Sequence, residues 1–158
     1  MPREIHGKHV VDGQRFAIVV SRFNEFITSK LVSGAVDVLH RHGCADENIT
    51  CVFVPGAYDI APVAMKLAGQ KKYDAIICLG CVIRGQTPHF EYVASEVAKG
   101  VAQVGLQSGV PTTFGVITAD TIEQAVDRAG IKAGNKGADA TISAIELVDV
   151  MRQLDGDG

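Results

Sequence analysis

The chain has 158 residues, of which 47% are hydrophobic and 21% are charged, with a formal net charge of -3. This length suits one domain with a sizeable core, and the slightly acidic balance argues against an electrostatic interface with nucleic acid or an anionic membrane. No segment approaches the roughly 18 apolar residues of a membrane span, and the polar N-terminus lacks the apolar core of a signal peptide. We therefore expect a cytoplasmic protein that acts on a small molecule.

Four strand and helix units are predicted in chain order from short β-rich apolar runs, each followed by apolar residues at helical spacing. The first is a strand over residues 15–21 with a helix from the N-cap Asn24 to Gly43, and the second is a strand over 49–54 with a helix over about 57–68. The third is a strand over 75–83 with a helix over about 88–107. The fourth is a strand over 112–118, then a capping-box pattern over 120–123 that starts a short helix ending before Gly130. A last helix is predicted to about Leu154, with residues 1–10 as an N-terminal arm and 155–158 as a frayed tail.

Strands that are apolar throughout and alternate with helices indicate a parallel sheet covered on both faces. Right-handed crossovers then predict a three-layer α/β/α sandwich around a four-stranded parallel sheet, with residues 1–158 as one domain. Ligands of such sheets bind at the carboxyl ends of the strands. Neither of the two common glycine-rich nucleotide motifs occurs on these turns.

Four cysteines, Cys44, Cys51, Cys78 and Cys81, do not suggest a disulfide scaffold in a chain of this size. Cys78 and Cys81 form a C-x-x-C pattern, but side chains three residues apart on a strand point to opposite faces. We therefore expect no metal or redox pair there, and we interpret Cys44, Cys51 and Cys78 as small apolar core residues.

The turn after the third predicted strand carries the strongest chemical signal. Gly85, Gln86 and Thr87 can present backbone N–H groups to an anion at the start of the next helix, whose dipole favours negative charge by roughly 0.3–1 kcal/mol. His89 follows within the first helical turn, and an imidazole with a pKa of about 6.5 can both give and take protons at neutral pH. The alternative is a histidine simply packed on a helix start.

Two other turns carry aromatic residues and an acidic residue with two interpretations each. Phe23 and Tyr58 could stack on a planar ring or belong to the core. Asp59 could bind a ligand or only cap a helix.

Five motifs stand in order along the chain: SRFN (21–24), VPGAYDI (54–60), VIRGQTPHFEYV (82–93), FGVITADTIEQAVDRAG (114–130) and KAGNKGADA (132–140). Together they resemble the 6,7-dimethyl-8-ribityllumazine synthase family over nearly the whole chain after about residue 10. The resemblance implies a flavodoxin-like fold and no metal or redox cofactor. It implies the penultimate step of riboflavin biosynthesis, which condenses 5-amino-6-(D-ribitylamino)uracil with L-3,4-dihydroxy-2-butanone 4-phosphate to give the lumazine, phosphate and water.

The resemblance also assigns expected roles to residues of this sequence. His89 matches the proton-transfer residue, and the phosphate-binding positions are Gln86, Thr87 and Arg128. The substrate-binding positions are Phe23 and Phe114 around the ring, Ala57, Tyr58, Asp59 and the backbone of Cys81, Val82 and Ile83 for the pyrimidine and ribityl chain, and Lys136 in the ribityl pocket. Asp59 stands where many members have Glu, and Cys81 and Gln86 stand where small residues are frequent. For Arg84, a structural ion pair and a ligand contact both remain open.

Assembly follows from the expected positions of two of these residues. Phe114 lies near the start of its predicted strand and Arg128 near the end of the next helix, so we expect both on the sheet edge opposite the turns that carry His89. The site would then be shared between neighbouring chains. The resemblance implies pentamers, the compact turn KAGNKG is similar to members that form icosahedral 60-mer shells, and residues 1–10 hint at pairing with a neighbour's sheet edge.

The expected partners are thus small-molecule substrates, further copies of the chain, and riboflavin synthase, with no nucleic acid and no membrane. Two other functions remain open. One is a non-catalytic flavodoxin-like binder of flavin or nucleotide, and the other is a shell-forming carrier without turnover.

Overall fold

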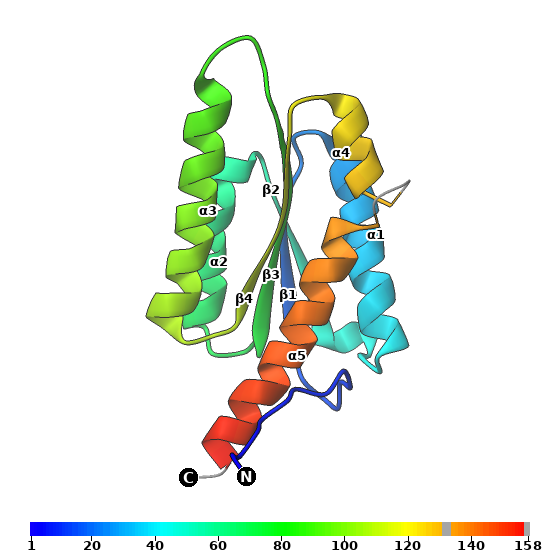
Figure 1. Ribbon diagram of the computed structural model, residues 1–158, viewed down its shortest axis with the longest axis vertical. Helices are drawn as coiled ribbons and strands as arrows, with labels where there is room; N and C mark the ends of the chain where they lie inside the picture. The colour runs from blue at the N-terminus through cyan, green and yellow to red at the C-terminus, as the bar shows by residue number, and fades with distance from the viewer. Residues whose placement is uncertain (131–133, 157–158) are drawn as a thin grey trace.

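The computed structural model describes residues 1–130 and 134–156. Within them, a four-stranded parallel sheet runs in the order β2-β1-β3-β4 (Figure 1). The strands are β1 (Phe16–Ser21), β2 (Ile49–Val54), β3 (Ala75–Ile83) and β4 (Thr112–Ala119). Each bound lies within one residue of the prediction. This order, in which the chain moves outward from β1 in both directions, is the flavodoxin-like one, so the expected fold class is confirmed.

Helices cover both faces of the sheet and make the expected three layers (Figure 1). Helices α2 and α3 pack against each other on one face, while α1 and α5 pack on the other face and α4 lies beside β4. Their bounds are α1 (Glu25–Arg41), α2 (Ile60–Gly69), α3 (His89–Ser108), α4 (Ile122–Arg128) and α5 (Lys136–Gly156), with 3-10 turns η1 (Asp46–Asn48) and η2 (Ala57–Asp59).

Several helix ends differ from the predictions. The second helix begins with the turn η2, so α2 itself starts only at Ile60. The N-cap of α4 is Thr121, whose Oγ1 accepts a hydrogen bond from the Gln124 N–H at 3.1 Å, one residue later than the pattern at Asp120 suggested. Helix α5 runs on to Gly156, so residues 155 and 156 are helical rather than frayed. Residues 157 and 158 lie outside the described part of the chain.

Asn24 occupies the predicted N-cap position of α1 but does not cap the helix with its side chain. Its backbone is left-handed, with φ of 66°, and its Nδ2 instead donates to the carbonyl oxygen of Cys81 at 3.0 Å. This bond ties the β1–α1 turn to the end of β3.

Two hydrophobic clusters form the core, one on each side of the sheet. Because side chains alternate along a strand, Ile18 of β1 belongs to one cluster and Val19 to the other. Cys81 and Cys78 of β3 are divided in the same way, as predicted. Burial raises the pKa of Cys78 to about 12 and that of Cys81 to about 11, so both thiols stay protonated at neutral pH.

The N-terminal arm lies along α5 of its own chain, and the start of the chain is close to the end of α5 (Figure 1). The Lys8 N–H donates to Asp149 Oδ2 at 2.8 Å, the His9 ring contacts Glu146 Oε1 at 2.8 Å, and Gln153 Nε2 donates to the His6 carbonyl at 2.8 Å. Pairing of this arm with a neighbour's sheet stays a prediction. Across residues 1–130 and 134–156, no helix combines the length and apolar character needed to span a membrane.

Candidate functional site

A cavity of about 760 Å³ opens at the carboxyl ends of β1, β2 and β3. This is the place expected for a ligand of a parallel sheet, and the volume falls in the range of small-molecule sites. Eight of the residues predicted for the site line this cavity: Phe23, Ala57, Tyr58, Cys81, Val82, Ile83, Thr87 and His89. Of the site residues predicted on the turns after β1, β2 and β3, Asp59 and Gln86 are not among its lining.

The β1–α1 turn brings Phe23 to the cavity. Backbone bonds from the Arg22 N–H to the Val54 carbonyl (2.8 Å) and from the Phe23 N–H to the Pro55 carbonyl (3.0 Å) carry the pairing of β1 with β2 beyond the strand ends. The Phe23 side chain is left 71% exposed and Tyr58 on the neighbouring turn is 65% exposed. The core interpretation is therefore wrong for both residues, and both rings are accessible for stacking on a ligand.

The turn η2 is organised by Asp59. Its Oδ2 accepts a hydrogen bond from the Gly56 N–H at 3.0 Å, so the carboxylate closes the turn that holds the buried Ala57. The capping interpretation of Asp59 is therefore the one seen in this chain. Contact of Asp59 with a ribityl chain stays a prediction.

His89 is the first residue of α3, and Pro88 occupies the N-cap position rather than the first turn. The His89 side chain is exposed and lines the cavity, so it is not packed away on the helix start. Gly85 and Thr87 also line the cavity, and the His89 N–H reaches Thr87 Oγ1 at 3.4 Å. An anion at this helix N-terminus would lie beside the imidazole.

Sequence reasoning missed the contribution of α3 beyond His89. Tyr92, Val93 and Glu96 also line the cavity. They stand three, four and seven residues after His89, which is the spacing of one helix face, so the helical periodicity of this segment could have found them.

Phe114, Arg128 and Lys136 lie elsewhere, in a second hollow of about 340 Å³ that Thr118 of β4 also lines. Strand β4 pairs only with β3 among the described strands and forms an edge of the sheet. None of the described residues that line the first cavity also lines this second hollow. The expected separation of the two groups within one chain is therefore seen.

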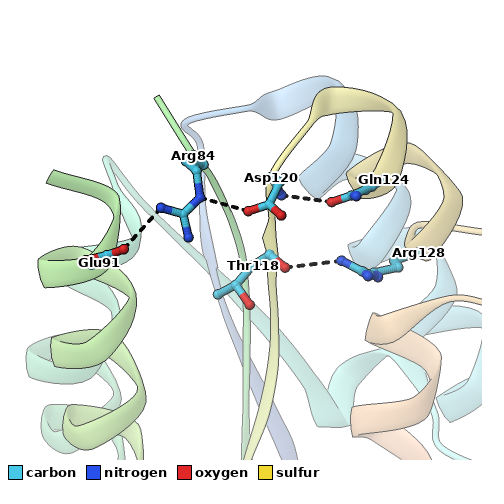
Figure 2. Close-up of polar contacts among 6 residues, drawn as sticks. All are labelled: Arg84, Glu91, Thr118, Asp120, Gln124 and Arg128. Atoms are coloured by element: carbon cyan, nitrogen blue, oxygen red, sulfur yellow. Dashed lines mark hydrogen bonds and ion pairs between the residues drawn. The ribbon is translucent and has the colours of Figure 1, made fainter. Parts of the chain in front are cut away.

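The expected position of Arg128 needs a correction. Its Nη1 donates to the carbonyl oxygen of Thr118 at 3.2 Å (Figure 2). Thr118 pairs with Val82 near the carboxyl end of the sheet. Helix α4 has only seven residues and so is about 10 Å long. It is too short to carry Arg128 to the opposite end of the strands. Arg128 and His89 are therefore apart because Arg128 lies on the outer edge of β4, and not because the two residues lie at opposite ends of the sheet.

The two hollows differ in charge. Among residues 1–130 and 134–156, no Lys or Arg lines the cavity beside His89, whereas the second hollow contains both Arg128 and Lys136. Arg84 comes after β3 but is already paired with Asp120 (2.8 Å) and Glu91 (3.1 Å), and hydrogen bonds to these two carboxylates raise its pKa above the ordinary value. Of the two interpretations of Arg84, the ion pair is the one seen.

Metal ligands were not expected at this site. In the part of the chain that the structure describes, no three His, Cys, Asp or Glu side chains come together as a metal site would require. The chemistry that the described residues offer is proton transfer by an imidazole, stacking on aromatic rings and anion binding at a helix N-terminus.

Fold and cavity together define an α/β protein with a small-molecule site at the carboxyl ends of a parallel sheet. A family model described as 6,7-dimethyl-8-ribityllumazine synthase matches residues 13–152. Because this match covers most of its length, the chain belongs to that family. A similar solved structure is a de novo designed Rossmann fold protein, at 15% identity over 72% of this chain and 91% of that chain with a TM-score of 0.38, too low to bear on the function.

Proposed function

We propose that the protein catalyses the condensation of 5-amino-6-(D-ribitylamino)uracil with L-3,4-dihydroxy-2-butanone 4-phosphate, giving 6,7-dimethyl-8-ribityllumazine, phosphate and water. The observation that carries the proposal is a cavity in which the exposed rings of Phe23 and Tyr58 face the same space as His89 and the backbone of Gly85. A planar heterocycle and a phosphate ester are the two kinds of substrate that such a cavity suits. Membership of the family supports the same reaction.

The chemistry requires little beyond positioning and proton movement. The amine of the pyrimidine forms a Schiff base with the ketone and releases one water, the phosphate then leaves by elimination, and the second nitrogen closes the ring onto the remaining carbonyl with loss of a second water. Each step moves a proton, for which His89 at the cavity rim is the proposed group. Stacking on Phe23 and backbone contacts from Cys81, Val82 and Ile83 would hold the pyrimidine in a reactive geometry.

We infer that the complete site is shared between adjacent chains. A phosphate ester carries up to two negative charges, and charge-assisted bonds to Arg or Lys are the strong way to hold it. The cavity beside His89 has neither residue in its described lining, whereas the hollow on the edge of β4 has Arg128 and Lys136 next to the exposed ring of Phe114. Docking of one chain's β4 edge over the cavity of the next would bring these groups together, and Gln86 and Thr87 with Arg128 would bind the phosphate.

A pentamer is the assembly we propose, with the icosahedral 60-mer as its further stage. The turn from which the shell was predicted includes Lys132 and Ala133, which lie outside the described residues. Riboflavin synthase as a partner and a cytoplasmic location stay predictions.

Purified protein mixed with both substrates tests the proposal directly. We expect the absorbance and fluorescence of the lumazine to appear faster than in the uncatalysed mixture. A rate no higher than that background would reject the enzyme and leave the flavin binder or the shell-forming carrier. Titration with riboflavin, followed by quenching of flavin fluorescence, would then separate those two.

A further inference from the structure

Arg84 makes three contacts that join separate parts of the chain around the candidate site. Its Nε donates to Asp120 Oδ1 at 2.8 Å and its Nη1 to Glu91 Oε1 at 3.1 Å (Figure 2). Its guanidinium carbon also lies 4.6 Å from the centre of the Phe90 ring. Asp120 belongs to the turn after β4, whereas Phe90 and Glu91 belong to the first turn of α3. The backbone of Arg84 is fixed as well, because its N–H donates to the Ala119 carbonyl at 2.8 Å.

These contacts leave Arg84 poorly suited to bind a phosphate itself. One positive charge stands between two carboxylates, so the cluster carries a net negative charge that repels an anion. Two of the five N–H groups of the guanidinium already donate to these carboxylates, and the ring of Phe90 lies against the guanidinium. Arg84 must therefore act through the groups that it holds.

The segment between these anchors is residues 85–88, here called the phosphate loop, and it is weakly held from within. The His89 N–H reaches Thr87 Oγ1 only at 3.4 Å. A Cβ added at Gly85 would find no neighbour within 4 Å, so the loop is not fixed by packing there. The contacts of Arg84 with Phe90 and Glu91 close the loop across its base, directly beside His89.

The second arm of the same contact set leads to Arg128. The Asp120 N–H donates to Gln124 Oε1 at 2.9 Å, and Gln124 lies in α4, the short helix that ends with Arg128 (Figure 2). Arg84 thus connects the phosphate loop of one hollow with the helix that presents the arginine of the other hollow. In both hollows, the connected group is the one proposed to meet the phosphate.

We propose that Arg84 is a positioning residue for the phosphate substrate, which fixes the phosphate loop and His89 through Glu91 and Phe90 and fixes α4 through Asp120. This inference rests on the proposed function. It differs from a general stabilising role because removal of the Arg84 side chain should affect the phosphate substrate and spare the pyrimidine substrate, whose proposed contacts at Phe23 and the end of β3 do not involve Arg84.

The test compares Arg84→Ala and Arg84→Lys with Arg41→Ala as a matched control. Arg41 is an exposed arginine paired with Asp37 at 2.9 Å on α1, outside the lining of both hollows. For Arg84→Ala we expect kcat/KM for the phosphate substrate to fall about tenfold, because the substitution removes two exposed ion pairs and the cation–π interaction with Phe90 at once, with KM for the pyrimidine changed less than about twofold. Arg84→Lys should recover part of this activity, because an ammonium can hold one carboxylate but lacks the planar fork for both. Arg41→Ala should behave as the wild type.

Calorimetric titration with inorganic phosphate gives a readout that does not depend on turnover. We expect phosphate to bind several-fold more weakly to Arg84→Ala than to the wild type. If the wild type makes no lumazine, the proposed function fails while this titration still tests the role of Arg84. Should Arg84→Ala not fold, Glu91→Gln and Asp120→Asn each remove one ion pair and should show a smaller effect of the same kind.

Two results would overturn the inference. One is unchanged phosphate affinity and unchanged kinetics in Arg84→Ala. The other is a rise in KM for the pyrimidine as large as that for the phosphate substrate, with no recovery in Arg84→Lys, which would make Arg84 a structural residue only.

Discussion

His89 and Arg128 line two different hollows of the same chain. His89 opens α3 on the rim of the cavity at the strand ends, while Arg128 closes α4 against the Thr118 carbonyl on the outer edge of β4. Under the proposed function both residues serve one phosphate, so each active site takes its imidazole from one protomer and its guanidinium from the next.

Replacing His89 by alanine should slow the reaction without abolishing it. General acid–base catalysis by one side chain contributes typically 10²–10⁴-fold, and because positioning by the rest of the cavity persists we expect a fall in kcat of roughly 10² or less. His40→Ala is the control, since His40 lies on α1 beside Asp46 and does not line the cavity. Unchanged kcat at saturating substrates would remove His89 from proton transfer.

Co-assembly of two defective chains tests whether the site is shared. His89→Ala and Arg128→Ala, co-expressed in equal amounts and mixed at random in a symmetric assembly, should restore both groups in about one quarter of the sites. The rate, measured with the phosphate substrate well below its KM, should then exceed the mean of the two variants assayed separately. A rate equal to that mean would show that both residues serve the site of their own chain.

Gly137 is expected to be intolerant of any side chain. It is buried near the start of α5, and a Cβ there would lie 2.2 Å from the backbone oxygen of Leu31 on α1. Gly137→Ala must push α5 from α1, at a cost of about 1–3 kcal/mol in the free energy of unfolding. Gly69→Ala is the matched control because its Cβ meets nothing within 4 Å. Urea unfolding of both variants measures the difference, and equal midpoints would contradict the prediction.

The N-terminal arm should loosen in acid because of Asp149. Hydrogen bonds from the Lys8 N–H, first of all, and from Gln153 and Arg152 lower the pKa of this carboxyl below its ordinary value of 3.8. Its contribution to stability is therefore present above about pH 3.8 and is lost as the pH falls through the lower folded-state pKa.

Urea unfolding between pH 5 and about pH 2.5 should show this decrease in stability in the wild type and a flatter pH dependence in Asp149→Asn. Asp127→Asn, at a half-buried position of α4, is the control and should keep the wild-type slope. An Asp149→Asn curve parallel to the wild type would mean that Asp149 does not couple the arm to pH.

Strands were predictable to within a residue because each is a continuous apolar run that a sheet buried on both faces requires. Helix starts were less predictable, since a cap depends on what else competes for its side chain. Asn24 has the right residue type for a cap, but its amide is taken by the Cys81 carbonyl of a strand distant in sequence. The position of Arg128 was misjudged because the short α4 ends beside Thr118, near the strand ends.

The lining residues on the turns after the strands could be predicted from the sequence, whereas those on the face of α3 were missed. Phe23, Tyr58 and His89 all follow strand ends and could be placed from topology. Tyr92 and Glu96 stand further along α3, and only the packing of α3 beside η2 decides that they face the same space. The contacts of Arg84 with Asp120 and Glu91 needed the three-dimensional fold, because they join segments whose proximity no local pattern encodes.

If each active site is formed by the cavity of one chain and the Arg128 hollow of the next, the assembly must be closed for every site to be complete. A row of chains joined by β4 edges would leave an unmatched cavity at one end and an unmatched Arg128 hollow at the other. Only a closed ring would pair every His89 cavity with an Arg128 hollow. Activity per chain would then be highest in closed rings. An open or incomplete assembly would always have an incomplete site at each end.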